Sequence, residues 1–279
     1  MSFIDTIKER AKKDKKTIVL PETMDSRIME ATEKILNENI ADVILIGTEE
    51  EISKSSQGFD ISRATVINPY TSNLTEELIN ELVELRKNKG LTYDDAKKLL
   101  LEDYMYYACM LVKTKRADGV VSGACHSTAN TLRPALQIIK TKPGTLLVVP
   151  DCNYGENGTF IFADSGLEQN PTPERLAAIA ASSAETFRLL VEKEPKVAML
   201  SHSTMGSASH ADVDKVVEAV KIAKENYPQY KIDGELQLDA AIVPEVAASK
   251  APNSEVAGQA NVLVFPDLDA GNIGYKLVQ

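Results

Sequence analysis

Short apolar runs recur along the chain, and amphipathic stretches lie between most of them. Their Val, Ile and Leu content is typical of buried parallel strands, and alternation with helices indicates an α/β fold with helices on the sheet faces. The predicted strands are Thr17–Leu20, Asp42–Ile46, Ala64–Ile67, Gly119–Ser122, Leu146–Val149, Thr159–Phe162, Val197–Ser201, Gln237–Ile242 and Val262–Phe265. The predicted helices are Ser26–Glu38, Glu76–Lys89, Tyr93–Lys113, Glu174–Glu192 and Val213–Glu225.

One stretch, Asp151–Pro173, departs from this rhythm. It is rich in Gly, Asn, Asp and Pro, and it predicts an inserted hairpin or a long functional loop. At its end, Thr172 is the expected N-cap of the next helix and Pro173 its first residue. Lys140–Gly144 (KTKPG) is the expected crossing between two domains.

The composition places the chain among globular proteins. With 279 residues, 43% of them hydrophobic, it can form one large domain or two smaller ones. The apolar runs are far shorter than the ~20 residues of a membrane helix, and the charged start MSFIDTIKERAKKDKK lacks a signal-peptide core. Three widely spaced cysteines, Cys109, Cys125 and Cys152, favour free thiols over disulfides. We therefore expect a cytoplasmic protein that has no membrane span.

The net charge of −10 and the absence of Trp make the chain a poor nucleic-acid binder, because binding the phosphate backbone requires basic patches. An anionic small substrate is still compatible with this charge if a few arginines lie at its site.

The most informative segment is Asp118–Arg133, DGVVSGACHSTANTLR, in which a strand leads through small and hydroxylated residues into a helix. Ligands of open α/β sheets bind beyond the carboxyl ends of strands. Gly123 and Ala124 permit a ligand to approach the backbone closely, and the N-terminus of the following helix attracts anions. The guanidinium group of Arg133 can bind two oxygens of a phosphate or carboxylate. The hydroxyls are those of Ser122, Ser127, Thr128 and Thr131. The segment predicts an anion site.

Other interpretations of this segment stay open. The hydroxyls are also the ordinary caps of helices, and Pro134 either starts the helix or bends one that starts earlier. Cys125 beside His126 raises the question of a Cys–His nucleophile. Because adjacent residues rarely face each other, a small filler is the expected role of Cys125.

Two further strand ends carry small polar residues. Ser201–Ser209 has the same order of strand, small-residue loop and helix but no nearby arginine, so a tight turn explains its small residues as well as ligand binding does. The third candidate segment runs from Phe265 to Asn272. Asp164, Asp239 and Asp267 are expected to be turn or cap residues. The three histidines are scattered and form no metal-binding motif, so no metal site is predicted.

Several segments closely resemble the phosphate acetyltransferase (phosphotransacetylase) family. They are SGACHSTANTLRPALQIIKT, VPDCNYGENGTFIFADSG, KVAMLSHSTMGSA, DGELQLDAAIVPEVAASKAP and NVLVFPDLDAGNIGYKLVQ, with LPETMDSRIMEA and ELRKNKG fitting the same pattern. The resemblance covers essentially the whole chain. It implies the reaction acetyl-CoA + phosphate ⇌ acetyl phosphate + CoA, with coenzyme A as a substrate and no cofactor. It also implies two α/β/α domains with mainly parallel sheets, an active-site cleft between them, and a homodimer.

By this resemblance, residues 1–141 form the first domain and residues 142–279 the second, inserted one. Ser127 and Thr128 match positions at the phosphate or acetyl phosphate site, Arg133 matches the site arginine, and Arg86 matches an arginine that binds coenzyme A. Ser122, Gly123, His126 and Thr131 are expected to bind substrate. The implied mechanism is a direct attack of the coenzyme A thiolate on acetyl phosphate, which disfavours Cys125 as a nucleophile.

Two family features are missing from this sequence. One is a C-terminal segment that carries a Ser-Arg pair and the aspartate proposed as the base, and the other is an aromatic stretch before VVPDC. The base is therefore unassigned, and a truncated chain is expected to turn over weakly or not at all. The alternatives are an acyltransferase for longer groups such as butyryl, and a binding or regulatory domain of the same fold.

Overall fold

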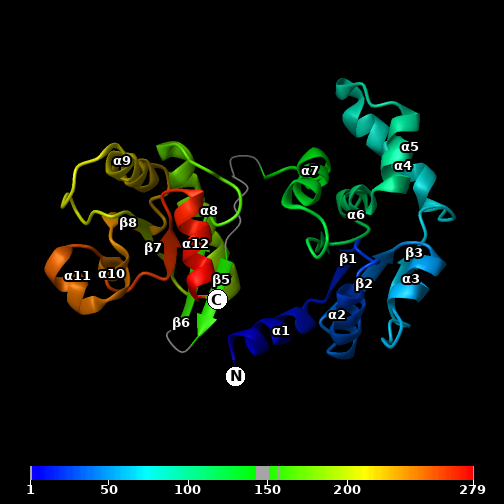
Figure 1. Ribbon diagram of the computed structural model, residues 1–279, viewed down its shortest axis with the longest axis horizontal. Coiled ribbons are helices and arrows are strands. Elements are labelled where there is room, and N and C mark those ends of the chain that lie inside the picture. Colours follow the sequence, from blue (N-terminus) through cyan, green and yellow to red (C-terminus); the bar gives the residue numbers. More distant parts are fainter. Residues whose placement is uncertain (1, 143–150, 156–157, 279) are drawn as a thin grey trace. The chain divides into compact units, whose positions relative to one another are not determined.

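The computed structural model describes residues 2–142, 151–155 and 158–278, and it confirms the predicted α/β class (Figure 1). The chain divides into two compact units, Met1–Thr141 and Lys142–Gln279, which are described separately. None of the described helices is long and apolar enough to span a membrane.

The first unit contains a parallel four-stranded sheet in the order β3-β2-β1-β4. The chain runs outward from β1 to β3 and then returns to the other side of β1, so the strand order reverses between β1 and β4. In open α/β sheets this reversal marks the usual ligand site. The strands are β1 (Lys16–Leu20), β2 (Ala41–Ile46), β3 (Thr65–Ile67) and β4 (Gly119–Val120). The helices are α1 (Phe3–Lys13), α2 (Ser26–Asn37), α3 (Glu49–Ser55), α4 (Leu74–Arg86), α5 (Tyr93–Glu102), α6 (Tyr104–Lys113) and α7 (Thr128–Ile138).

Both faces of this sheet are covered. Successive side chains of a strand point to opposite faces. Leu20 therefore packs in a core with Met29 and Leu36 of α2, whereas Val19 packs with residues of α4 and α6 such as Leu82 and Tyr107. Figure 1 shows α2 and α6 on opposite sides of β1 and β2. The first unit is thus a three-layer arrangement.

The second unit has a five-stranded sheet in the order β5-β6-β9-β7-β8, parallel except for the antiparallel β5–β6 hairpin. Val197 and Met199 of β7 pack with α8 and α9 on one face, and Ala198 and Leu200 pack with α10 and α11 on the other. The strands are β5 (Asp151–Gly155), β6 (Gly158–Ala163), β7 (Lys196–Leu200), β8 (Lys231–Leu236) and β9 (Val262–Val264). The helices are α8 (Pro173–Val191), α9 (Ala211–Asn226), α10 (Leu238–Ile242), α11 (Pro244–Lys250) and α12 (Leu268–Val278).

Most predicted elements are present, and the hairpin and the start of α8 are confirmed: Thr172 accepts a hydrogen bond from Arg175 N, with Pro173 first in the helix. The strand predicted at Gln237–Ile242 is wrong. Gln237 is the N-cap of α10, and Leu238–Ile242 form that helix. Its residues Ala240 and Ala241 are fully buried, and alanine has the highest helix propensity. The strand in this region is β8, whose charged residues and glycine interrupt the apolar pattern by which strands were predicted. The predicted strand Leu146–Val149 lies outside the described residues.

The single helix predicted over Tyr93–Lys113 is also wrong, because it is two helices that meet at Asp103. Asp103 has an extended backbone (φ −129°, ψ 97°), and its carboxylate accepts a hydrogen bond from Met105 N at 3.0 Å. This is the geometry of an N-cap, for which aspartate is a preferred residue, so α6 starts anew there.

Candidate functional site

The candidate site of the first unit lies at the carboxyl ends of β1 and β4. These strands are parallel neighbours, with Ile18 opposite Gly119 and Val19 opposite Val120. The loops that follow them, residues 21–25 and 121–127, therefore leave the sheet at the same edge, where the strand order reverses. This is the place at which the sequence predicts an anion site.

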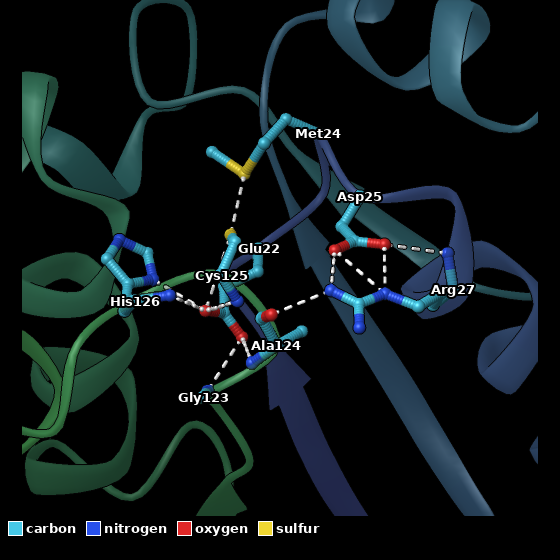
Figure 2. Close-up of polar contacts among 8 residues, drawn as sticks. All are labelled: Glu22, Met24, Asp25, Arg27, Gly123, Ala124, Cys125 and His126. Carbon is cyan, nitrogen blue, oxygen red and sulfur yellow. Dashed lines mark hydrogen bonds and ion pairs between the residues drawn. The ribbon is translucent and has the colours of Figure 1, made fainter.

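A buried glutamate joins the two loops (Figure 2). The Glu22 carboxylate has no solvent exposure and accepts backbone N–H groups from four consecutive residues. Gly123 and Ala124 donate to Oε2 at 2.8 and 2.9 Å, and Cys125 and His126 donate to Oε1 at 2.9 and 2.8 Å. Burial raises the pKa of Glu22, but these hydrogen bonds outweigh it and hold the pKa well below its usual range. Glu22 is thus ionised at neutral pH.

The same carboxylate orients the His126 ring. His126 Nδ1 lies 2.7 Å from Glu22 Oε1. Because an ionised carboxylate is only an acceptor, Nδ1 must carry the proton of this hydrogen bond. The imidazole is therefore held by Nδ1, and Figure 2 shows its second nitrogen on the edge of the ring that faces away from Glu22. The side chain is 23% exposed.

The ion pair of Asp25 and Arg27 also holds the loop, through a carbonyl oxygen. Arg27 Nη2 donates to the carbonyl oxygen of Ala124 at 2.7 Å, and its guanidinium also binds the carboxylate of Asp25. Asp25 in turn caps α2 by accepting from Arg27 N. Gly123 has a φ of +119°, which glycine adopts without the strain of a side chain. Four N–H groups and the Ala124 carbonyl group of this loop are thus held in place.

The helix that follows starts at Thr128, so Pro134 lies inside it. Ser127 is its N-cap and accepts a hydrogen bond from Asn130 N at 3.3 Å; Ser127 and Thr128 are exposed. The capping interpretation of Ser127 is therefore correct, and its hydroxyl proton remains available to a ligand. The buried hydroxyl oxygens of Ser122 and Thr131 have no hydrogen-bond partner among the described residues.

The two predicted arginines of this unit belong to α4 and α7. Arg86, at the end of α4, donates to the carbonyl oxygen of Gln137 at 3.3 Å, and the exposed Arg133 belongs to α7. Tyr106 donates its hydroxyl to Gln137 Oε1 at 3.0 Å. Burial raises the pKa of Tyr106, while the positive charges of Arg133 and Arg86 act in the opposite direction.

Cys125 is exposed, so it does not fill a buried space, but its surroundings disfavour a nucleophile as well. Burial, a contact of Sγ with Glu22 Oε1 at 3.5 Å, and the negative charge of Glu22 all raise the pKa of the thiol. A thiolate is thus disfavoured at neutral pH. Glu22, Cys125 and His126 also bring three metal-ligand types within 4.8 Å of one another. Their arrangement suits a cation poorly, because both Glu22 oxygens already accept N–H groups.

The second unit also contains a buried glutamate that holds a loop after a neighbouring strand. Glu235, at the end of β8, accepts from the Ser203 hydroxyl at 2.8 Å and from Gly206 N at 2.7 Å, while Ala208 N donates to Ser203. These residues follow β7, the parallel neighbour of β8. The contacts are those of a braced turn, which accounts for the small residues of Ser201–Ser209.

Asp164 and Asp267 act as turn and cap residues, as the sequence predicts, whereas Asp239 forms an ion pair with Lys250. Asp164 accepts from Gly166 N and Glu168 N, Asp267 accepts from Ala270 N, and Asp239 pairs with Lys250 at 3.0 Å. The third candidate segment is shaped by packing. A Cβ at Gly271 would lie 2.2 Å from the carbonyl oxygen of Asp164, so only glycine permits this approach of α12.

Sequence reasoning did not single out Glu22. Its local signal is slight, a glutamate two residues after a strand, and 101 to 104 positions separate it from the groups that it binds. The adjacency of β1 and β4 could have pointed to it.

Comparisons with known proteins agree along the whole chain. The model of the phosphate acetyl/butaryl transferase family matches residues 2–279. The phosphate acetyltransferase of Thermoanaerobacterium thermosaccharolyticum is 54% identical, covering 100% of this chain and 87% of the relative, and that of Bacillus subtilis is 47% identical, covering 99% and 86%. The solved EutD phosphotransacetylase from Staphylococcus aureus superposes with a TM-score of 0.91 at 43% identity, covering 99% of this chain and 85% of that one. The chain therefore belongs to the phosphate acetyl/butaryl transferase family.

Proposed function

We propose that this chain is a phosphate acetyltransferase, which moves an acetyl group reversibly between coenzyme A and inorganic phosphate. The observation that carries the proposal is the loop braced by Glu22, which delivers the hydroxyls of Ser127 and Thr128 and the N-terminus of α7 to one sheet edge. A helix N-terminus with hydroxyl donors suits a phosphate group. Family membership supplies the reaction class.

Acetyl is favoured over longer acyl groups. The relatives from Thermoanaerobacterium thermosaccharolyticum and Acetivibrio thermocellus, at 54% and 52% identity, are both named phosphate acetyltransferase. A branched-chain phosphotransacylase from Enterococcus faecalis has a TM-score of 0.65 at 20% identity, a likeness of fold alone. Butyryl transfer is the second candidate, because the family includes it.

In the proposed mechanism both substrates are bound together, and the acyl group passes directly between them. The phosphoryl group of acetyl phosphate binds the hydroxyls of Ser127 and Thr128, with Arg133 neutralising its charge, and Arg86 binds coenzyme A. The thiolate attacks the carbonyl carbon, and the donors stabilise the developing oxyanion and the leaving phosphate. Holding two substrates in reacting geometry supplies a large part of the rate.

Ser122 and Thr131 stay predicted substrate-binding residues, because a hydroxyl can donate to a phosphoryl oxygen. Gly123 and His126 belong to the same loop, and their binding of substrate stays a prediction. The expected homodimer stays a prediction, which the sedimentation coefficient tests.

The experiment follows acetyl-CoA formation from acetyl phosphate and coenzyme A, with propionyl and butyryl phosphate compared. Arg133→Ala is expected to lower kcat/KM about a hundredfold, the scale of losing one donor to developing charge. Arg188→Ala is the matched control, because Arg188 lies in the second unit and pairs there with Glu185 and Tyr230. If the folded parent protein shows no exchange activity, the proposed enzymatic function is wrong. If it then binds coenzyme A without turnover, the chain is a binding domain.

A further inference from the structure

The turn after β1 exposes one apolar side chain, that of Met24. Asp25 N donates to the carbonyl oxygen of Glu22 at 3.1 Å and closes the turn. The Glu22 carboxylate is buried beneath the neighbouring loop, and the buried Thr23 hydroxyl donates to the carbonyl oxygen of Ile46 at 2.6 Å. Met24 follows these two anchored residues and is 58% exposed. The turn therefore presents a methionine from a backbone that is held in place.

The exposed end of Met24 contacts the loop after β4. Met24 Sδ is 3.8 Å from Cys125 Sγ. Figure 2 shows the thioether reaching across to Cys125, with its methyl group on the side of the loop where the His126 ring lies. The proposed phosphate donors, Ser127 and Thr128, come next in the chain. Because two residues span at most about 7 Å, Met24 touches the loop close to these donors.

The charged groups around Met24 are already engaged with one another. Glu22 accepts the four backbone N–H groups of the loop, and Asp25 pairs with Arg27. Val121, which begins the same loop, is exposed like Met24. The two loops therefore offer apolar side chains at the sheet edge that also carries the hydroxyl donors. The apolar part of an acyl phosphate is its acyl chain.

We propose that Met24 is a specificity-determining residue, whose side chain forms the wall that limits the length of the transferred acyl group. The inference rests on the proposed function and names the feature that selects acetyl within it. With the phosphoryl group at Ser127 and Thr128, the acyl chain of the bound acyl phosphate extends toward Met24. The methyl group of acetyl phosphate fits against this wall, whereas a butyryl chain is longer by about 2.5 Å and collides with it.

A wall selects by size only if its backbone does not retreat. The buried contacts of Glu22 and Thr23 hold the turn, so a longer acyl chain must displace the Met24 side chain itself. Methionine is unbranched and adaptable, which predicts a graded preference with propionyl between acetyl and butyryl. One methylene in an apolar pocket changes kcat/KM by about 10- to 200-fold.

The test measures kcat/KM for acetyl, propionyl and butyryl phosphate at a constant concentration of coenzyme A. Met24→Ala shortens the wall, and Met24→Leu keeps most of its volume. Leu189→Ala is the matched control, because Leu189 is exposed to nearly the same degree and lies on α8 of the second unit. Thermal unfolding of each variant shows that its fold is retained.

We expect the parent to prefer acetyl phosphate. In Met24→Ala, kcat/KM for butyryl phosphate relative to acetyl phosphate is expected to rise about tenfold or more, because the wall no longer meets the added methylenes. In Met24→Leu the ratio should stay within about threefold of the parent, since leucine conserves the volume of methionine. Leu189→Ala should have the ratio of the parent.

An unchanged ratio in Met24→Ala would overturn the proposal, as would an equal rise in Leu189→Ala or a parent that uses butyryl phosphate as well as acetyl phosphate. Calorimetric binding of the two acyl phosphates without coenzyme A applies the same comparison in the absence of turnover. A parent that binds acetyl phosphate more tightly than butyryl phosphate, loses this preference in Met24→Ala and has no exchange activity would retain the wall and reject the proposed function. The two failures are therefore distinguishable.

Discussion

Glu22 Oε1 lies 2.7 Å from His126 Nδ1, although 104 positions separate the two residues in the chain. The contact exists because β1 and β4 are parallel neighbours, so that the loops after them share one edge of the sheet. Through this carboxylate the sheet order determines the conformation of the loop that we assign to substrate binding.

Replacing Glu22 by Gln should destabilise the first unit. The amide keeps the shape of the carboxylate but places an NH₂ group against backbone N–H groups of residues 123–126. A buried donor that loses its acceptor costs about 1–3 kcal/mol, and breaking a buried ionic arrangement costs about 3–5 kcal/mol. The free energy of unfolding, measured by urea titration, should therefore fall by several kcal/mol. Glu30→Gln is the control, since its surface pair with Lys34 contributes little. An unchanged Glu22→Gln midpoint would contradict the proposed bracing.

Acid should destabilise the parent through Glu22. Its pKa is depressed in the folded protein, so its ionised form contributes stability that is fully present above the unfolded-chain pKa of about 4.3 and is lost as the pH falls toward the folded value. Urea unfolding at several acidic pH values should show this loss in the parent. In Glu22→Gln the slope of stability against pH should be smaller, and equal slopes would argue against ionised Glu22.

Replacing Arg86 by Ala should weaken coenzyme A binding more than catalysis. A charged hydrogen bond is worth about 1.5–3 kcal/mol, which corresponds to a rise of about tenfold or more in KM for coenzyme A. Initial-rate kinetics with acetyl phosphate at saturation measure this effect. Arg63→Ala, which removes a surface contact with Asn37, is the control. A change in KM for acetyl phosphate alone would instead assign Arg86 to binding acetyl phosphate.

Replacing Cys125 by Ala should leave kcat within a few fold of the parent. The thiol pKa is raised by burial and by Glu22, and the direct mechanism assigns it no covalent role. Steady-state kinetics test this expectation, and a disulfide reagent should label Cys125 slowly at neutral pH. Loss of activity by several orders of magnitude would instead indicate an acyl-enzyme.

Replacing Gly271 by Ala should destabilise the second unit. The new Cβ would lie 2.2 Å from the carbonyl oxygen of Asp164, so α12 or the chain after β6 must shift. Overpacking of this kind typically costs about 1–3 kcal/mol. Gly119→Ala is the matched control, because its Cβ meets only the Ile18 Cδ1 atom at 3.3 Å. Equal midpoints for the two variants in thermal unfolding would refute this packing argument.

Local chemistry made much of the molecule predictable. Thr172 and Pro173 start α8 because a hydroxyl cap and a residue without N–H suit the first turn of any helix. Most of the other apolar runs formed parallel strands, because a strand buried on both faces favours a continuous run of apolar residues. The run Gln237–Ile242 was misread because alanines pack equally well in a buried helix, and only tertiary contacts distinguish the two.

The chain by itself determined the α/β class, the segment of residues 118–133 and, through its resemblance, the family. Only the tertiary structure decided which residue organises that segment. The residues next to Glu22 in the sequence do not indicate its role. Its carboxylate holds the loop because four backbone N–H groups donate to it in a place that solvent does not reach. That convergence follows from the order of strands in the sheet, which depends on long-range packing rather than on any local pattern.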